Sequence, residues 1–249
     1  PHHTNEIAQS AAASSDAPRA EDFAQYWIHN GFLNVDDEKM SKSLGNFSTV
    51  EQVLSRFDAE ALRLFLLGTH YRRDMNFTDG LLEEAERRVR SLYETLDKAD
   101  RQGTGVEPPE EPGPAVEASL RALDDDFNTP QVLAVLAEVF TQANALADRK
   151  GKRAPPEKAA LSGLARDVRR VGAVLGILQR PPGAALLAIR ARAAARRGID
   201  PGAVEARIAE RAAARAARDF TRGDTIRGEL LRQGVVLMDG PGGTTWAVD

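Results

Sequence analysis

The sequence of 249 residues contains no cysteine, so it cannot form a disulfide framework. It has no apolar run near the about 18 residues that a membrane helix requires, and no signal peptide opens it. Its formal net charge is −4, so the chain as a whole lacks the basic excess typical of nucleic-acid-binding proteins. We therefore expect a soluble, monomeric, cytoplasmic protein without membrane contacts. Any contact with nucleic acid must come from a local patch.

Such a patch lies near the C-terminal end. From Arg190 to Arg232 the chain carries eleven arginines and six acidic residues, a local net charge of +5. One interpretation is an RNA-binding surface, on which Arg215 and Arg218 would contact phosphates. The other is a solvated helix that is merely rich in alanine and arginine. The sequence leaves both open.

Residues 39–43 read Lys-Met-Ser-Lys-Ser and are followed by the turn-prone Leu-Gly-Asn. Lys39 and Lys42 lie three positions apart on a short, hydroxyl-rich segment, so their ammonium groups can act as point charges on the phosphates of a nucleotide. Lysines aimed at a departing pyrophosphate stabilise the transition state more than the ground state. Ser41 and Ser43 either hold such a loop closed or are ordinary turn residues.

His2 and Glu6 are four positions apart and share one face if the segment is helical, so both side chains can reach one ion. Pairs of this kind are more often surface hydrogen bonds than metal ligands.

The apolar pattern predicts a mainly α protein. Thr49 and Gln52 form a capping box, Asp58 caps the next helix, and that helix ends near Gly68. From residue 78 a core seam of five residues steps by four, four, three and four, and further helices follow, one of them with Thr129 as its N-cap. The seam consists of Leu81, Ala85, Val89, Leu92 and Leu96.

We divide the chain into residues 1–75, a helical bundle at 76–180, a linker at 181–199 and a small module at 200–249. The bundle should be antiparallel, because its helices have short connections. The C-terminal module is α+β, with two helices and a hairpin formed by Val235–Met238 and Thr244–Val248. The hairpin must pack on those helices, because two strands alone are not stable.

Four further segments narrow the interpretation. Residues 1–10 read Pro-His-His-Thr-Asn-Glu-Ile-Ala-Gln-Ser, residues 26–31 Tyr-Trp-Ile-His-Asn-Gly, residues 124–130 Asp-Asp-Asp-Phe-Asn-Thr-Pro and residues 239–246 Asp-Gly-Pro-Gly-Gly-Thr-Thr-Trp. Together with the lysine segment, which resembles the signature loop of class I aminoacyl-tRNA synthetases, they resemble bacterial cysteinyl-tRNA synthetases in the family's order. Thr4 departs from the glutamate that is usual in that family.

The resemblance implies a catalytic Rossmann domain upstream, with a His-Ile-Gly-His-type motif and zinc-binding cysteines that this chain lacks. We interpret residues 1–75 as the end of the catalytic domain with the signature-loop and stem-contact region, and the chain as a C-terminal portion that is inactive alone. The family's partners would be ATP with Mg²⁺, L-cysteine and cysteine tRNA. Lys42 matches its ATP-binding lysine, and His2 and Glu6 match two of its zinc ligands.

By the same resemblance, residues 200–249 form an anticodon-binding module, in which Asp239 and Trp246 would contact unpaired bases; Trp246 is equally well explained as a core residue. Residues 58–63, Asp-Ala-Glu-Ala-Leu-Arg, resemble the motif that names a helical anticodon-binding domain, or form only a capped amphipathic helix. The implied function is ligation of cysteine to tRNA. The alternatives are a non-catalytic tRNA-binding synthetase fragment and a related ligase of cysteine with an amino sugar.

Overall fold

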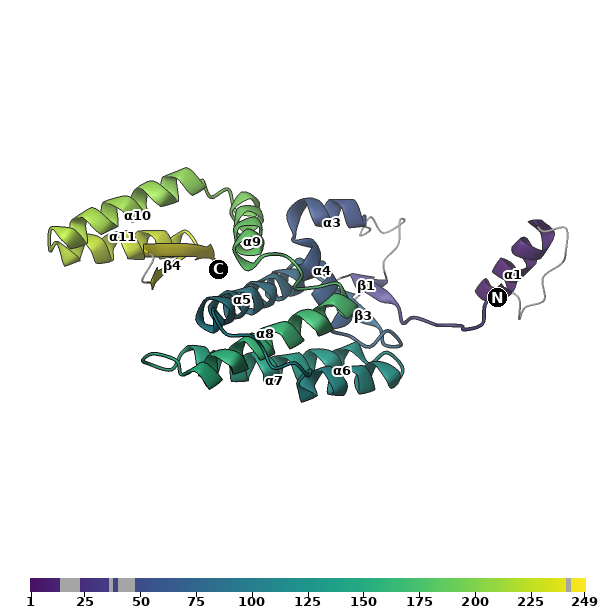
Figure 1. Cartoon of the computed structure of the whole chain (residues 1–249). Coiled ribbons are helices and arrows are strands. Elements are labelled where there is room, and N and C mark those ends of the chain that lie inside the picture. Colours follow the sequence, from purple (N-terminus) through teal and green to yellow (C-terminus); the bar gives the residue numbers. More distant parts are fainter. Residues whose placement is uncertain (14–22, 36–37, 40–47, 241–242) are drawn as a thin grey trace.

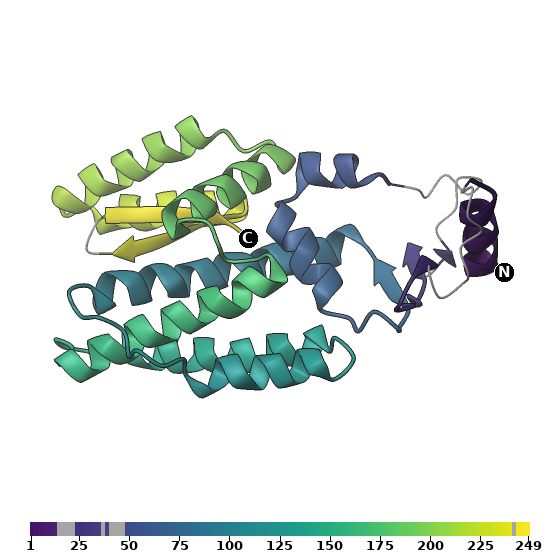
Figure 2. The same ribbon diagram turned by 45° about the vertical axis from the view of Figure 1, so that its right-hand side comes forward.

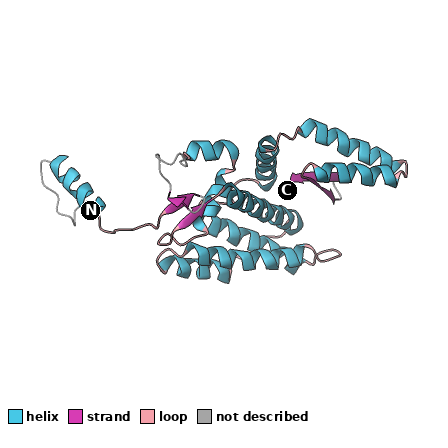
Figure 3. Cartoon of the chain, turned by 180° about the vertical axis from the view of Figure 1, so that it is seen from behind, coloured by secondary structure: helices cyan, strands magenta, loops and turns pink. Residues whose placement is uncertain are grey.

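The computed structural model describes residues 1–13, 23–35, 38–39, 48–240 and 243–249, and it is mainly helical (Figures 1 and 3). Its helices are α1 (His2–Ala13), α3 (Val50–Arg56), α4 (Ala59–Leu67), α5 (Asp79–Gly103), α6 (Pro114–Asp124), α7 (Thr129–Ala147), α8 (Pro155–Leu175), α9 (Pro182–Arg196), α10 (Pro201–Ala216) and α11 (Phe220–Arg232). Its strands are β1 (Leu33–Val35), β2 (Glu38–Lys39), β3 (Met75–Phe77), β4 (Val235–Gly240) and β5 (Gly243–Val248).

A small sheet with strand order β2-β1-β3 lies at the N-terminal side of the helical bundle (Figure 2). β1 pairs antiparallel with β2 and parallel with β3. The sequence predicted a strand before the lysine segment but not β3. Gly31 lets the segment before β1 lie close to the segment before β3. Its amide donates to the carbonyl of Tyr71 at 2.7 Å, and a Cβ at this position would lie 2.2 Å from the carbonyl oxygen of Arg73. Only glycine allows this approach.

Two caps predicted from the sequence are confirmed. The Gln52 amide donates to Thr49 Oγ1 at 3.1 Å, while the Thr49 amide donates to Gln52 Oε1 at 2.8 Å, which completes the capping box of α3. The Glu60 amide donates to Asp58 Oδ1 at 3.0 Å at the start of α4, whose C-cap is Gly68. The two helices therefore begin where the sequence places them.

Helices α5, α6, α7 and α8 pack side by side around one apolar core, which extends from Ala61 in α4 to Ile189 in α9 (Figures 1 and 2). The predicted seam of α5 is partly wrong. Leu81 is 40% exposed, and the buried side of the helix instead includes Leu82 and Tyr93. In the observed orientation of α5 the Tyr93 hydroxyl donates to the carboxylate of Glu60 in α4, a partner 33 residues away that the local pattern does not indicate.

The cap of α7 is one residue earlier than predicted. Asn128 is the N-cap, and its side chain accepts a hydrogen bond from the Gln131 amide at 3.2 Å. The Thr129 hydroxyl instead donates to the carbonyl of Leu67 at 2.8 Å, which joins α7 to the end of α4. A contact 62 residues away in the chain decides which of two adjacent capping residues is used.

Residues 181–199, the expected linker, are largely helix α9. Its first half contributes Ala185 and Ile189 to the bundle core, and its second half contributes Ala193 and Ala194 to the core of the C-terminal module. In that module α10 and α11 pack on the predicted hairpin of β4 and β5, in which Leu237 pairs with Trp246. The linker is thus a helix shared by two cores.

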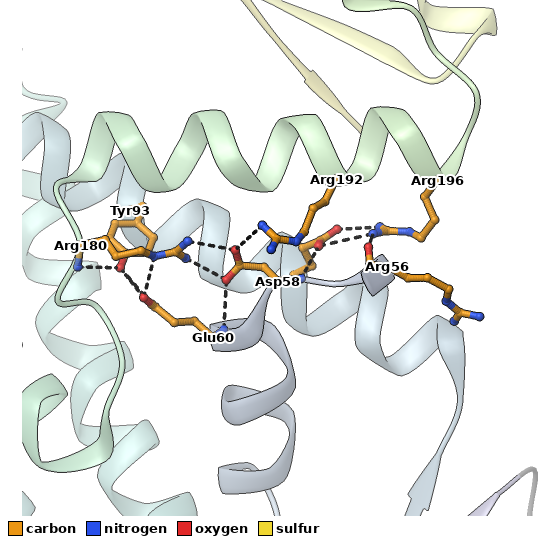
Figure 4. A network of polar contacts seen from close by, with 8 residues as sticks. Arg56, Asp58, Glu60, Tyr93, Arg180, Arg192 and Arg196 are labelled. Carbon is orange, nitrogen blue, oxygen red and sulfur yellow. Dashed lines mark hydrogen bonds and ion pairs between the residues drawn. The ribbon is translucent and has the colours of Figure 1, made fainter. Parts of the chain in front are cut away.

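A buried polar network joins α4, α5 and the connection between α8 and α9 (Figure 4). Asp58 is 1% exposed, and Arg180 donates to its two oxygens at 2.8 and 3.0 Å. Arg180 Nε also donates to Glu60 Oε1 at 2.8 Å. Burial raises the pKa of Tyr93 to about 12, and its hydrogen bond to Glu60 acts in the same direction. The Arg180 side chain therefore neutralises Asp58 and Glu60 at the start of α4, while its amide donates to the Tyr93 hydroxyl of α5 at 3.3 Å.

We expect Arg180→Gln to lower the free energy of unfolding by about 2–4 kcal/mol, because the change leaves the buried carboxylate of Asp58 without its main cation. Urea denaturation of this chain measures the effect. Arg170→Gln is the matched control: Arg170 is exposed on α8, so its replacement should change stability by less than about 0.5 kcal/mol. Equal stability of the two variants would show that the network contributes no net stability.

Candidate functional site

The structure describes both flanks of the lysine segment. Lys39 ends β2 and pairs in register with Asn34 of β1, and Thr49 caps α3 on the other side. Ser41, Lys42 and Ser43 lie outside the described residues. The sheet and α3 thus hold the two ends of the segment to which the sequence assigns phosphate contacts.

His2 and Glu6 lie on one face of α1, as their spacing predicts. His2 Nε2 is 3.9 Å from Glu6 Oε1, and the two side chains are largely exposed. Two ligands on one tetrahedral zinc ion would be separated by about 3.4 Å, so small rotations would let the pair bind it. Among the described residues, no third His, Cys, Asp or Glu joins them in a group that could hold a metal. The pair fits half of a tetrahedral site.

His3 has a different environment. Its ring lies 4.5 Å from the rings of both Trp27 and His29, centroid to centroid. Partial burial, followed by the nearby charge of His29, lowers the pKa of His3. These ring contacts join α1 to the extended segment that leads to β1, so His3 fits a structural role beside His2 and Glu6 better than that of a ligand.

We expect this chain alone to retain less than one equivalent of zinc after dialysis, because two protein ligands leave a tetrahedral site half complete. Elemental analysis measures the content, and zinc titration before and after His2→Ala measures whatever weak binding remains. That variant should abolish the weak binding, whereas Thr4→Ala on the same helix should not. One tightly bound zinc per chain would contradict the prediction.

Trp246 is a core residue of the C-terminal module. It is 3% exposed, its indole Nε1 donates to Glu205 Oε1 at 2.7 Å, and the guanidinium of Arg190 covers the ring at 4.6 Å from the centroid. A hairpin of two strands needs such an anchor on its helices. This arrangement matches the core alternative, and it leaves no open indole surface on which a base could stack.

Asp239 has a partner in α10. Arg211, whose side chain is 3% exposed, donates to both of its carboxylate oxygens at 2.8 Å, and Thr244 Oγ1 donates to Oδ1 at 2.7 Å. These contacts, with Arg211 the larger cause, hold the pKa of Asp239 well below its usual range. About half of the Asp239 side chain stays exposed, so Asp239 joins β4 to α10 and still faces solvent.

More than half of the arginines in the arginine-rich segment form ion pairs within the chain. Six of its eleven arginines pair with carboxylates, namely Arg192, Arg196, Arg197, Arg207, Arg211 and Arg222. Arg215 and Arg218 are exposed at the end of α10, and no carboxylate of the described residues lies within 4 Å of either. The positive charge available to a ligand is therefore smaller and more localised than +5 suggests. Arg215 and Arg218, which the sequence analysis proposed as phosphate contacts, are part of that available charge.

A second ordered cluster joins the turn after α4 to the turn before α7. Asp126 accepts hydrogen bonds from Tyr71 Oη and Arg72 Nε, each at 2.5 Å, and the ring of His70 stacks on Tyr71. The bond from Arg72, then that from Tyr71, lowers the pKa of Asp126 to about 2. No local pattern in the sequence indicates this cluster, because Asp126 lies 54 residues beyond Arg72.

Three family models match consecutive parts of the chain. Residues 1–87 match the tRNA synthetases class I (C) catalytic domain, residues 120–179 the DALR domain and residues 200–246 the cysteinyl-tRNA ligase anticodon binding domain. Residues 180–199, which contain α9, fall between the second and third matches.

Curated relatives match the whole chain. A cysteine–tRNA ligase of Anaeromyxobacter sp. (strain K) is 70% identical over 249 residues, 100% of this chain and 52% of that protein. The corresponding protein of Geobacter metallireducens is 45% identical over 258 residues, with the same coverage. The chain thus spans about half the length of these relatives. A solved LeuRS–tRNA–LeuAMS complex of Agrobacterium radiobacter K84 aligns with a TM-score of 0.46 and 22% identity over 65% of this chain and 22% of that one.

Proposed function

Because the chain belongs to the cysteine–tRNA ligase family, we propose that it takes part in the ATP-dependent attachment of cysteine to its tRNA in the cytoplasm. Cysteine's carboxylate attacks the α-phosphate of ATP, which gives cysteinyl-adenylate and pyrophosphate. The terminal adenosine of the tRNA then accepts the cysteinyl group and AMP leaves. The observation that carries this proposal is the run of three family matches in one order from residue 1 to residue 246.

In this proposal Lys42 and Lys39 contact the phosphates of ATP, with Ser41 and Ser43 holding the segment over the nucleotide. β2, which ends at Lys39, and α3, which is capped by Thr49, are the described elements on either side of this segment. Lysine charge placed against the leaving pyrophosphate stabilises charge that develops only in the transition state.

His2 and Glu6 supply two ligands to a zinc ion whose other ligands come from outside this chain. When bound, zinc favours the thiolate of substrate cysteine over the hydroxyl of serine, because thiolate is the softer and better ligand. His2 and Glu6 are exposed and share one face of α1, which supports this role.

The acceptor is tRNA in this proposal, with Arg215 and Arg218 on phosphates and the half-exposed Asp239 as the candidate base contact of the C-terminal module. The match of residues 200–246 to an anticodon-binding domain supports a tRNA acceptor over an amino sugar, which has no anticodon to recognise. A non-catalytic tRNA-binding role would keep the module but would not need the two lysines.

We expect Lys42→Ala in the full-length protein to lower the rate of pyrophosphate exchange by about 100- to 10,000-fold, as removal of a charged transition-state interaction does. Cysteine affinity should hardly change, because the proposal assigns the cysteine thiol to the zinc held by His2 and Glu6 and not to Lys42. Lys42→Arg, which keeps the charge, should recover part of the rate. Normal exchange with weakened cysteine binding would refute the assignment of Lys42.

Replacing Arg215 and Arg218 with glutamine should weaken binding of every tRNA alike and reduce the slope of log K against log salt by about 0.7–0.9 per residue, because each replacement removes one cation from a phosphate. Filter binding with cysteine tRNA and an anticodon-swapped transcript at two salt concentrations measures both effects. Lys150→Gln, an exposed change at the α7–α8 turn, is the control. A selective loss of the cysteine anticodon preference would mean that these arginines contact bases.

A further inference from the structure

A groove of about 460 Å³ lies between α3 and α9. Ser55 and Arg56 line it from α3, and Arg192 and Arg196 line it from α9, over a floor of three alanines. No carboxylate is among the described residues that line it. Helix α9 lies between α3 and the C-terminal module in the views of Figures 1 and 2, so it forms the wall of the groove that is nearer to the module.

Arg192 is only loosely engaged by the fold. Its Nη1 lies 3.8 Å from Asp58 Oδ2, a carboxylate that already receives two shorter hydrogen bonds from Arg180. The Arg192 side chain is 42% exposed. Asp58 would therefore keep its main cation if Arg192 turned toward a ligand.

Arg56 is similarly available. It pairs with Asp79, but both side chains are about half exposed, and surface pairs of this kind contribute little stability. In Figure 4 its side chain points away from the Arg180 network. Its guanidinium also lies 5.1 Å from the ring centroid of the adjacent Phe57, a contact that a small rotation can release.

Arg196 is the fixed member of the set. Its side chain is 16% exposed, Nη2 donates to Glu86 Oε2 at 2.6 Å, and Nη1 donates to the Arg56 carbonyl at 2.8 Å. It therefore ties α9 to the end of α3 and sets the spacing of the groove. One fixed and two adjustable guanidinium groups thus face the same space.

The chemistry of this lining matches a phosphodiester. Guanidinium groups offer paired donors in a planar arrangement that suits phosphate oxygens, and alanine methyl groups offer no competing donor or acceptor. The described lining itself holds no carboxylate, and Asp58, Asp79 and Glu86 lie near it only as partners of its three arginines. The Ser55 hydroxyl donates to the carbonyl of Gln52 at 2.8 Å, so the arginines are the donors that this lining offers to an anion.

We propose that this groove binds the phosphodiester backbone of the tRNA, with Arg56 and Arg192 as the cations that turn toward it. The proposal rests on the proposed function, and it assigns a role to α9, which none of the three family models covers. Contacts here carry no base information, so they position the tRNA between the catalytic side of the chain and the C-terminal module.

The test is filter binding of the full-length protein to cysteine tRNA and an anticodon-swapped transcript at low and moderate salt. Arg56→Gln and Arg192→Gln should each weaken binding of both RNAs by about the same factor and lower the salt slope by about 0.7–0.9, and the double variant should lower it by about twice that. Lysine at either position keeps the charge and should keep the slope.

Arg170→Gln, an exposed change on α8 away from the groove, is the matched control and should leave affinity and slope unchanged. Urea midpoints of the glutamine variants should equal that of the wild type, which excludes unfolding as the cause. If the double variant binds tRNA with wild-type affinity and slope, the groove proposal is overturned while the proposed function stands. If the wild-type protein itself fails to bind tRNA, both are overturned.

Discussion

The buried carboxylate of Asp58 is the constraint on which the arrangement of the chain depends. It caps α4, it is almost fully removed from water, and it is neutralised by Arg180 from the connection between α8 and α9. The Asp58 amide donates to Glu86 of α5 at 3.2 Å. Because an uncompensated buried charge costs several kcal/mol, α4 cannot move away from α5 and α9 without breaking these hydrogen bonds. These hydrogen bonds therefore fix the position of the start of α4 relative to the bundle.

Helix α9 extends this constraint to the C-terminal module. A connection between two domains ordinarily permits relative motion unless a large apolar interface prevents it. Here one helix contributes to both cores, through Ile189 on the bundle side and Ala194 on the module side. A further tie comes from Arg90 of α5, whose Nη1 donates to the carbonyl of Val248 at 3.1 Å. The module is therefore held at a defined place beside the bundle.

The features that the sequence predicted well are those decided within a few residues. The capping box at Thr49 and the hairpin ending in Val248 depend on short-range hydrogen bonds and alternation, and both are confirmed. The rotation of α5, the cap of α7 and the burial of Trp246 depend on partners 33 to 62 residues away, which no local pattern reveals. For the same reason the sequence did not predict the role of Arg180, because Arg180 lies in the connection after α8 and its partner Asp58 is 122 residues away. Of the site, the shared face of His2 and Glu6 follows from their spacing, whereas the groove between α3 and α9 follows only from their packing.

The arginines show why composition alone misjudges a binding surface. A run with a net charge of +5 suggests a continuous basic stripe, yet three of its arginines are neutralised in part by Asp58, Glu83 and Glu86, which belong to other parts of the chain. Five arginines of the run have no carboxylate partner among the described residues, namely Arg190 over the Trp246 ring, Arg215 and Arg218 at the end of α10, and Arg227 and Arg232 in α11. In the proposals above, phosphate contacts at separate points would fix the register of a folded RNA, whereas a continuous stripe would let it slide. The ion pairs that hold the domains together therefore also determine which arginines are left for a ligand.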